Sequence, residues 1–376
     1  MASGEPGPPG RDLAEQLRAD TAAGVVSRDE AAIYAFLALF APDQLPASYK
    51  NLPVDVPHCS AGVVRAAKDA VKGVDPELSE AFAAALPQPC SENFAHSIRS
   101  SVYPLIVHYD DATLASVAAD TLRLTEEQWD LQVLTMGQTA PLLDGGACGP
   151  DENIDIFLLP IDRGTGWYDV VAPNPATFYD DWSTYTMINS NFAVWPEWFT
   201  LEGTVAHEFQ HMLQCADDCW ENGNLYETTT ILIEKVMDEN WDHYDRAFPV
   251  FAKHPYRPLE FDDNWGPFVY GKAQYAFFLR DRYFDGDASF IADFWRNTRS
   301  PARGCWDCLP ELNEPDIYDA IDTILGAIGP YDHVDSIIEF SRWRWYVGRQ
   351  DDGNHFEEGG LWPNTTIPPY ERFVRT

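Results

Sequence analysis

Basic residues are scarce in this sequence. Its 376 residues include 25 Lys and Arg against 60 Asp and Glu, which gives a formal net charge of −35 at pH 7. Such a charge repels nucleic acid and anionic lipid, so we expect neither nucleic acid nor a membrane as a partner. Because the acidity is spread along the whole chain, we interpret it as a feature that favours solubility rather than as a specific binding patch.

Long apolar runs are also missing. No segment is long enough to cross a bilayer, and the first residues, MASGEPGPPGRDLAEQ, contain no hydrophobic core of a signal peptide. Their Gly and Pro content is typical of a flexible leader. Neither GxSxG nor a phosphate-cradling glycine loop is present. With 45% apolar residues, the chain can bury a large core, and its length suggests two or three structural units.

Cysteine occurs seven times, an odd number, so at least one cysteine has no disulfide partner within the chain. A CxxC lies at 305–308 and a CxxxC at 215–219. Four thiolates from these two motifs would suit a structural zinc ion. We favour local disulfides in a secreted enzyme instead, with Cys59 and Cys90 as a further pair.

Apolar spacing divides the chain into three regions. Residues 1–95 predict a flexible leader followed by helices separated by Pro-rich breaks. Residues 96–222 predict strands, such as VYPLIVHYDD and NIDIFLLPI, one long helix, and then the motif helix described next. Residues 223–376 are mostly helical in pattern. We therefore predict an α+β fold, with a mixed-sheet lobe, a helical C-terminal lobe and a helical N-terminal region.

The segment TVAHEFQHMLQ, residues 204–214, contains the pattern HExxH. Residues four apart lie on one face of a helix, so His207 and His211 would present both imidazoles to one metal ion. Zinc bound by two imidazoles and a carboxylate activates a water molecule, and Glu208 would accept its proton. The alternative is a chance motif in a core helix. The apolar residues between the polar ones favour a helix with one buried side and one side facing a cleft.

Three glutamates compete for the place of third ligand. Glu221 lies in a turn, CWENGN, which is a poor scaffold. Glu227 and Glu234 lie two turns apart on one face of the next predicted helix, YETTTILIE. Glu227 begins that helix, level with the histidines, so we predict that it binds the metal, while Glu234 accepts a hydrogen bond from a ligand histidine.

HEFQH followed by YETTTILIE resembles the gluzincin metallopeptidases, and residues 95–376 are similar to bacterial secreted metalloproteases. The resemblance implies a thermolysin-like zincin fold and a zinc-dependent peptidase activity. The segment VYGKAQYAFFLRD is similar to a helix of the aminopeptidase N and leukotriene hydrolase branch, in which a tyrosine supports the transition state; Tyr270 is the matching residue. YET stands here where that branch has NEG.

The sequence thus predicts a secreted, monomeric zinc metallopeptidase that acts on protein or peptide substrates. We expect the strand at 183–193 to line the cleft as a free edge, because it directly precedes the metal helix and a peptide can pair with such an edge. Two alternatives remain open. In the first, the protein is a non-catalytic adhesion or scaffold protein on a peptidase fold. In the second, it is a zinc hydrolase that acts on a non-peptide substrate.

Overall fold

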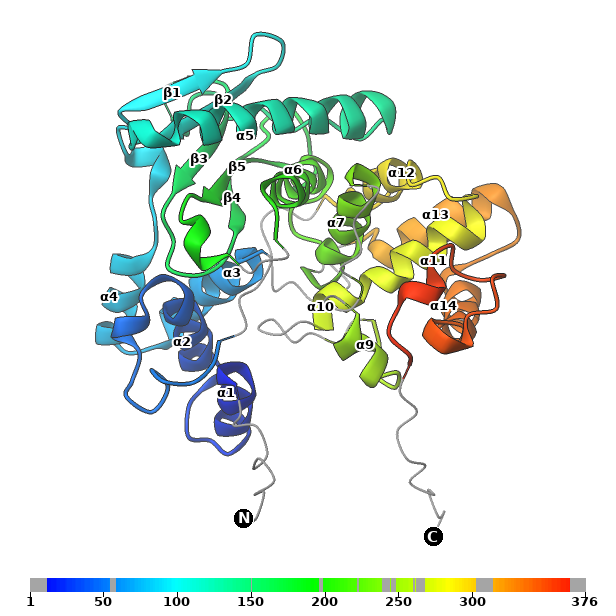
Figure 1. Cartoon of the computed structure of the whole chain (residues 1–376). Coiled ribbons are helices and arrows are strands. Elements are labelled where there is room, and N and C mark those ends of the chain that lie inside the picture. Colours follow the sequence, from blue (N-terminus) through cyan, green and yellow to red (C-terminus); the bar gives the residue numbers. More distant parts are fainter. Residues whose placement is uncertain are drawn as a thin grey trace, which may run out of the picture.

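The structure is a computed structural model, which describes residues 12–54, 59–149, 151–195, 199–221, 223–238, 244, 248–259, 261, 268–301 and 314–365. It is an α+β fold built around one mixed sheet. Helix α6 lies centrally, between the sheet lobe and the C-terminal helices (Figure 1).

The N-terminal region contributes four α-helices, which are α1 (Leu13–Ala22), α2 (Arg28–Phe40), α3 (Ala61–Ala70) and α4 (Pro76–Ala85). Local sequence explains their starts. The side chain of Asp12 caps α1, and Ser27 and Glu30 form a reciprocal capping box on α2. Asp75 caps α4, with Pro76 as its first residue.

The sheet has the strand order β1-β2-β3-β5-β4. Its strands are β1 (His96–Arg99), β2 (Leu105–Tyr109), β3 (Ile154–Leu159), β4 (Gly166–Pro173) and β5 (Trp182–Asn189). The two central pairs, β2 with β3 and β3 with β5, are parallel, and the outer pairs are antiparallel.

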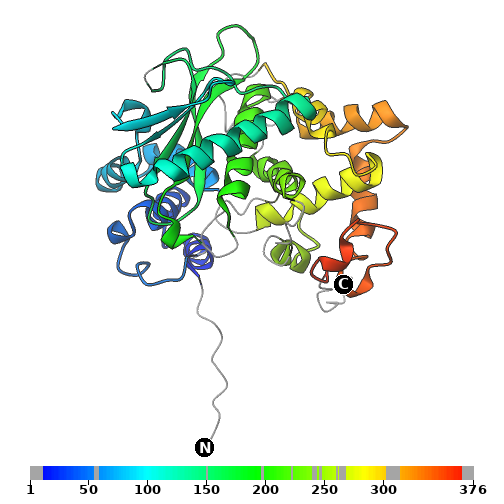
Figure 2. The ribbon, with the colours of Figure 1, turned by 45° about the horizontal axis from the view of Figure 1, so that its top comes forward.

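Helices cover both faces of the sheet. On one face, α5 (Ala115–Gln128), with its π-helical continuation Trp129–Thr135, and α6 (Leu201–Asp217) share an apolar core with β2 and β3. On the other face, α1 to α4 pack against sheet residues that include Phe157, Trp167 and Met187. Figures 1 and 2 both place these N-terminal helices (blue) beside the sheet lobe and away from the C-terminal helices. Their apolar interface makes them an integral layer of the sheet lobe, since each such buried side chain contributes about 1.5–3 kcal/mol.

The expectation that the strand at 183–193 is a free edge is wrong. Strand β5 pairs with β3 on one side and with β4 on the other, so β4 is the edge strand at this end of the sheet and β1 is the edge strand at the other. Four polar residues of β5 are buried, which are Ser183, Thr184, Thr186 and Asn189. Their polar side chains are what an exposed edge strand would carry, but in the structure the neighbouring strands and the helical layers bury them.

The C-terminal region is helical. Its elements are α7 (Gly223–Met237), α9 (Pro249–Lys253), α10 (Phe268–Gly271), α11 (Ala273–Tyr283), α12 (Phe290–Arg296), α13 (Ile317–Ile328) and α14 (His333–Trp343). They enclose a separate aromatic-rich core that includes Phe248, Phe277, Phe278 and Trp295. Helix α7 packs on both α6 and α11, which links this core to the central helix.

Candidate metal centre

Helix α6 places two imidazoles side by side. It begins after Thr200, whose side chain accepts a hydrogen bond from the backbone N–H of Gly203. His207 and His211 lie one turn apart on it, both completely buried, with their Nε2 atoms 3.1 Å from each other. The predicted helical spacing therefore brings both rings to one point.

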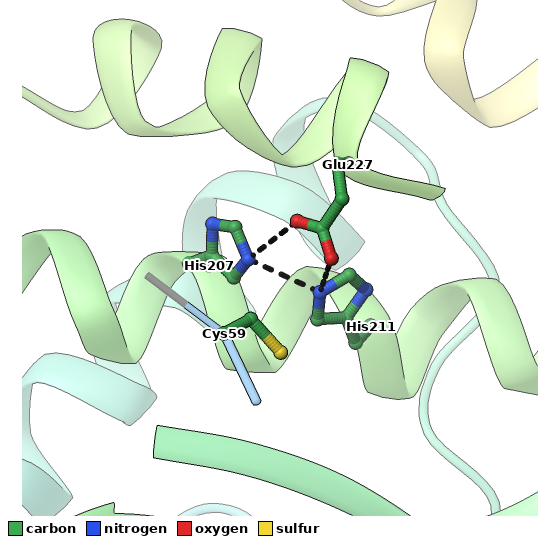
Figure 3. A group of neighbouring side chains, drawn as sticks. All are labelled: Cys59, His207, His211 and Glu227. Carbon is green, nitrogen blue, oxygen red and sulfur yellow. Dashed lines mark hydrogen bonds and ion pairs between the residues drawn. The ribbon is translucent and has the colours of Figure 1, made fainter. Parts of the chain in front are cut away.

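Glu227 completes a group of three. Helix α7 follows α6 after a short turn and packs along it, which brings the first turns of α7 level with the histidines. The Glu227 carboxylate lies 3.0 Å from Nε2 of His207 and 3.6 Å from Nε2 of His211. Figure 3 shows the carboxylate entering from one helix and both imidazoles from another.

The outer nitrogen of each ring has a partner that fixes its orientation. Nδ1 of His207 lies 2.7 Å from Oε1 of Glu234, so it donates a proton to that carboxylate. Nδ1 of His211 lies 2.7 Å from Oε1 of Gln214, whose amide nitrogen donates to the backbone carbonyl of Tyr226. Because the amide nitrogen is used in this way, the amide oxygen faces the ring and Nδ1 carries the proton. With Nδ1 protonated in each ring, both Nε2 atoms would offer a lone pair to a metal ion in the centre.

Sequence reasoning placed Glu234 here but overlooked Gln214. The signal was available, because Gln214 lies three residues after His211 and thus on the same helical face. Gln214 also donates to the hydroxyl of Thr229 on α7, at 2.9 Å. It therefore ties the metal helix to the helix that carries Glu227.

The spacing of these atoms fits a metal ion. Zinc bonds of about 2.0–2.1 Å to nitrogen and oxygen give a tetrahedral edge of about 3.3 Å. The two Nε2 atoms are 3.1 Å apart, and the Glu227 carboxylate lies 3.0 Å from His207 through Oε2 and 3.6 Å from His211 through Oε1. Two imidazoles and a carboxylate are ligands that zinc takes in catalytic sites.

Charge also favours a cation at this point. Burial lowers the pKa of His207, but the carboxylates of Glu227 and Glu234 outweigh it and raise the pKa to about 10. Burial lowers the pKa of His211 to about 3, a shift that the positive charge on His207 supports. Without a metal the carboxylates therefore hold a proton on His207 while His211 stays neutral, and a metal ion would bind here in exchange for that proton.

Glu208 lies beside this group and is completely buried. Its Oε2 accepts a hydrogen bond from the thiol of Cys59 at 3.5 Å, and its Oε1 has no hydrogen-bond partner within the described part of the chain. Burial is the main cause that raises the pKa of this carboxyl to about 8. A Cβ added at Gly166 of β4 would lie 3.1 Å from Oε1, so the glycine lets the edge strand pass directly over the carboxyl group.

The predicted pairing of Cys59 with Cys90 is wrong. Cys90 forms a disulfide with Cys148, and Cys59 is a free, buried thiol. Its Sγ lies with the ligand atoms of His207, His211 and Glu227 in one group whose atoms are all within 4.8 Å of one another (Figure 3). Burial and the nearby carboxylates raise the pKa of this thiol in the absence of a cation. Sequence reasoning thus missed one member of the site.

Tyr270, on α10, also reaches the site. Its hydroxyl accepts a hydrogen bond from the backbone N–H of Cys59 at 3.1 Å and donates one to the carbonyl of the same residue at 3.0 Å. The centroids of the Tyr270 and His207 rings are 6.5 Å apart. The ring is thus a neighbour of the ligands, while its role in a transition state stays a prediction.

The remaining candidates lie elsewhere. The expected local disulfide at 215–219 is present, at the end of α6, so these sulfurs are bonded to each other and do not serve a four-thiolate zinc site. The CxxC at 305–308 lies outside the described residues. Glu221 is buried in the turn before α7 and does not belong to the group around the histidines.

Comparisons with known proteins add no family assignment. No protein-family model matches the chain, and no curated protein matches it. None of the described helices is both long and apolar enough to span a membrane.

Proposed function

We propose that the protein is a zinc-dependent peptidase with a thermolysin-like arrangement of its metal site. One observation carries the proposal: both Nε2 atoms and the Glu227 carboxylate converge at distances of 3.0 to 3.6 Å, in a group with Cys59, whose thiol donates to Glu208. A chance HExxH in a core helix would have no reason to meet a third ligand, or to have each outer ring nitrogen hydrogen-bonded.

Each residue has a distinct task in this proposal. The zinc ion would be held by His207, His211 and Glu227. When bound, it would act as a Lewis acid, which lowers the pKa of water and polarises a carbonyl group. Glu208 takes the proton of the attacking water and passes it to the leaving amine. The hydroxyl of Tyr270 donates a hydrogen bond to the oxyanion. Glu234 and Gln214 keep the imidazoles in the required tautomer.

Edge strand β4 supplies a surface for an extended peptide. It is the outermost strand, and its first residue, Gly166, lies against Glu208. Main-chain pairing with such an edge binds peptides without requiring a particular sequence. We therefore assign to β4 the pairing with a substrate peptide that the sequence suggested for the strand at 183–193.

The disulfides that the described residues contain, Cys90–Cys148 and Cys215–Cys219, suit an oxidising environment. We include in the proposal that the protein is secreted, acts as a monomer and takes protein or peptide substrates. The strong negative charge disfavours nucleic acid and anionic membranes as partners.

A specific observation favours one rival function. With Cys59, four protein groups surround the metal position, and closed four-ligand sites are typical of structural zinc. In that case the centre would stabilise a non-catalytic adhesion or scaffold protein. The rival does not explain why Glu208 and Tyr270 also face the site. A zinc hydrolase of a non-peptide substrate would share all of these residues.

Metal analysis combined with substrate digestion tests the proposal. Purified protein should contain one zinc ion per chain and should cleave casein or a peptide library once the site is accessible, and a chelator should abolish cleavage. The Cys59→Ala variant should be assayed beside the parent chain, because Cys59 adds a fourth group to the metal position. Zinc without cleavage in both proteins would favour the structural centre. Cleavage of only non-peptide amides would favour the third alternative.

A further inference from the structure

Cys59 reaches the metal site from a distant part of the chain. It lies just before α3, in the N-terminal helical region, 149 residues before Glu208. Figure 3 shows it approaching the histidines from the side opposite to Glu227. A thiolate is a common zinc ligand, with a bond of about 2.3 Å. Its position therefore offers a fourth ligand, in the place that a catalytic site leaves open.

Several contacts hold Cys59 in this position. Tyr270 contacts both its backbone N–H and its carbonyl, and the N–H of Ser60 donates to the carbonyl of Gly166 at 2.9 Å. The N–H of Ala61, the first residue of α3, donates to Sγ at 3.4 Å. An N–H group at the start of a helix stabilises a thiolate. The sulfur is thus placed as a ligand, which packing alone would not require.

Helix α3 is fixed against the same site. The guanidinium group of Arg65 lies 4.7 Å from the ring centroid of Tyr168, and that ring stacks on His211 at 4.6 Å. Arg65 also donates to the carbonyl of Cys219, near the end of the metal helix, at 3.5 Å. These contacts connect the N-terminal region to the metal helix directly.

Cys59 contacts each group that hydrolysis would use. Its sulfur lies beside the metal ligands, on the side where the attacking water would bind. Its S–H donates to Glu208, and its carbonyl accepts a hydrogen bond from the hydroxyl of Tyr270. The site is also closed to substrate, since Glu227 is its most exposed member at 8% and Cys59 is 3% exposed. Its backbone bridge to Gly166 uses the first residue of the edge strand, which a bound peptide would otherwise pair with.

We propose that Cys59 is the fourth protein ligand of the metal and that the N-terminal region uses it to keep the enzyme latent. The ligand assignment stands on geometry alone, whereas latency rests on the proposed peptidase function. Activation requires the run Cys59–Ser60 to leave the site. The helices α1 to α4 need not leave with it, because their apolar core holds them on the sheet.

A cobalt spectrum tests the ligand independently of any activity. Cobalt(II) bound to a thiolate shows a sulfur-to-metal charge-transfer absorption in the near ultraviolet. The cobalt-substituted parent chain should show this band, and Cys59→Ala should bind cobalt without it. Cys59→Ser serves as a second variant in case the alanine variant fails to fold. Cobalt bound to the parent chain without the band would overturn the ligand assignment.

Casein cleavage by the zinc-loaded proteins tests latency. Cys59→Ala should cleave at least about tenfold faster than the parent chain, since loss of the metal–sulfur bond opens the fourth position and removes the strongest contact that keeps the run Cys59–Ser60 in the site. Val64→Ala is the matched control, because Val64 is buried in α3 of the same segment and does not belong to the metal group. It should leave the parent's low activity unchanged. Equal activation by Val64→Ala would show that loosened packing, rather than loss of the sulfur, opens the site.

A thiol reagent provides an activation test without mutation. Phenylmercuric acetate transfers its phenylmercury group to the Cys59 sulfur: a mercury–sulfur bond forms, the metal–sulfur bond breaks and acetate leaves, with no change of oxidation state. The parent chain should gain activity and lose the cobalt band, whereas Cys59→Ala should change in neither respect.

The outcomes separate the two proposals. An active parent chain that Cys59→Ala does not exceed would overturn latency and leave the peptidase function intact. A cobalt band with no cleavage by either protein would overturn both latency and the peptidase function, and would assign Cys59 to a structural metal centre. A band in the parent together with activity only after loss or capture of the sulfur would support both.

Discussion

Nδ1 of His207 lies 2.7 Å from Oε1 of Glu234, 27 residues further along the chain. This hydrogen bond connects α6 with α7 and selects the tautomer whose Nε2 faces Glu227. A histidine without such a partner would lose orientation and basicity as a ligand.

We expect Glu234→Ala to weaken zinc binding about 10- to 100-fold, because partners of ligand histidines contribute on this scale. Glu227→Ala should weaken it more, since a direct ligand is lost. Competition with a chromogenic chelator would measure both affinities. Glu221→Gln is the matched control, since this buried glutamate lies outside the ligand group. If Glu221→Gln reduced zinc affinity as strongly as Glu227→Ala, our ligand assignment would be wrong.

Glu208→Gln should retain zinc but lose hydrolysis by a factor of about 100 or more, because the proton acceptor is removed while the ligands stay. The substitution should be made in the Cys59→Ala chain, in which the position beside Glu208 is open. Zinc content and casein cleavage would be measured together. Retention of the turnover of the Cys59→Ala chain would rule out Glu208 as the base.

Tyr270→Phe removes a hydroxyl that contacts the backbone of Cys59. In the Cys59→Ala chain, we expect kcat to fall about tenfold or more, since the oxyanion loses a donor, while zinc content stays unchanged. Steady-state kinetics would separate kcat from KM. A rise in KM alone would instead indicate that the tyrosine only helps to bind the substrate.

Much of this site follows from local sequence. The spacing of His207 and His211 fixes their common helical face, and the turn before α7 brings Glu227 back to them. The carboxylate partner at Glu234 follows from its position two turns further on α7. These relationships depend on helical periodicity and one short connection, which a single sequence displays.

Other features depend on contacts between distant segments. Cys59 belongs to the metal group only because α3 packs beside β4, and disulfide connectivity, which sets Cys90 against Cys148, does not follow from a single sequence. The expectation of a free edge at 183–193 was wrong for the same reason. Strand β5 is an interior strand and β4 an edge strand because of the strands with which they pair, and not because of their own composition.

Gly166 allows β4 to pass over Glu208. A Cβ at this position would lie 2.8 Å from the carbonyl oxygen of Met187 and 3.1 Å from Oε1 of Glu208. We therefore expect Gly166→Ala to destabilise the protein by about 1–3 kcal/mol, as overpacking does. Gly62→Ala, in α3, is the control, because its Cβ would meet no atom within 4 Å. Urea unfolding of both variants should show a loss of stability for Gly166→Ala only. If Gly166→Ala were as stable as the parent, the space around Gly166 would not be as crowded as we argue.

Asp180 and Asp218 provide a pH-dependent test of the interior. Both are completely buried, and burial raises the pKa of Asp180 to about 7. Burial, the charge of Asp180 and that of Glu221 raise the pKa of Asp218 as well. Between the unfolded value, about 4, and the folded value, the folded protein binds more protons than the unfolded chain. The contribution of Asp180 to the free energy of unfolding is therefore fully present below about pH 4, and it decreases as the pH rises towards 7.

Asp218 adds a loss of its own over the same pH range, because its pKa is also raised by burial and by the charges of Asp180 and Glu221. Asp218→Asn should remove this second loss, because the amide has no proton to release, and it keeps a group that can donate to Asp180, a contact that favours the ionised form of Asp180. We expect the variant to be more stable than the parent by about 1–3 kcal/mol at pH 8, the scale of one uncompensated buried group, and to differ little near pH 4. Urea unfolding of the disulfide-intact, metal-free proteins at both pH values would measure this difference, since zinc binding would otherwise add its own pH dependence. Asp43→Asn, at an exposed position, should match the parent at both. An Asp218→Asn variant that is less stable than the parent at pH 8 would show that the ionised pair is tolerated and that the burial argument fails.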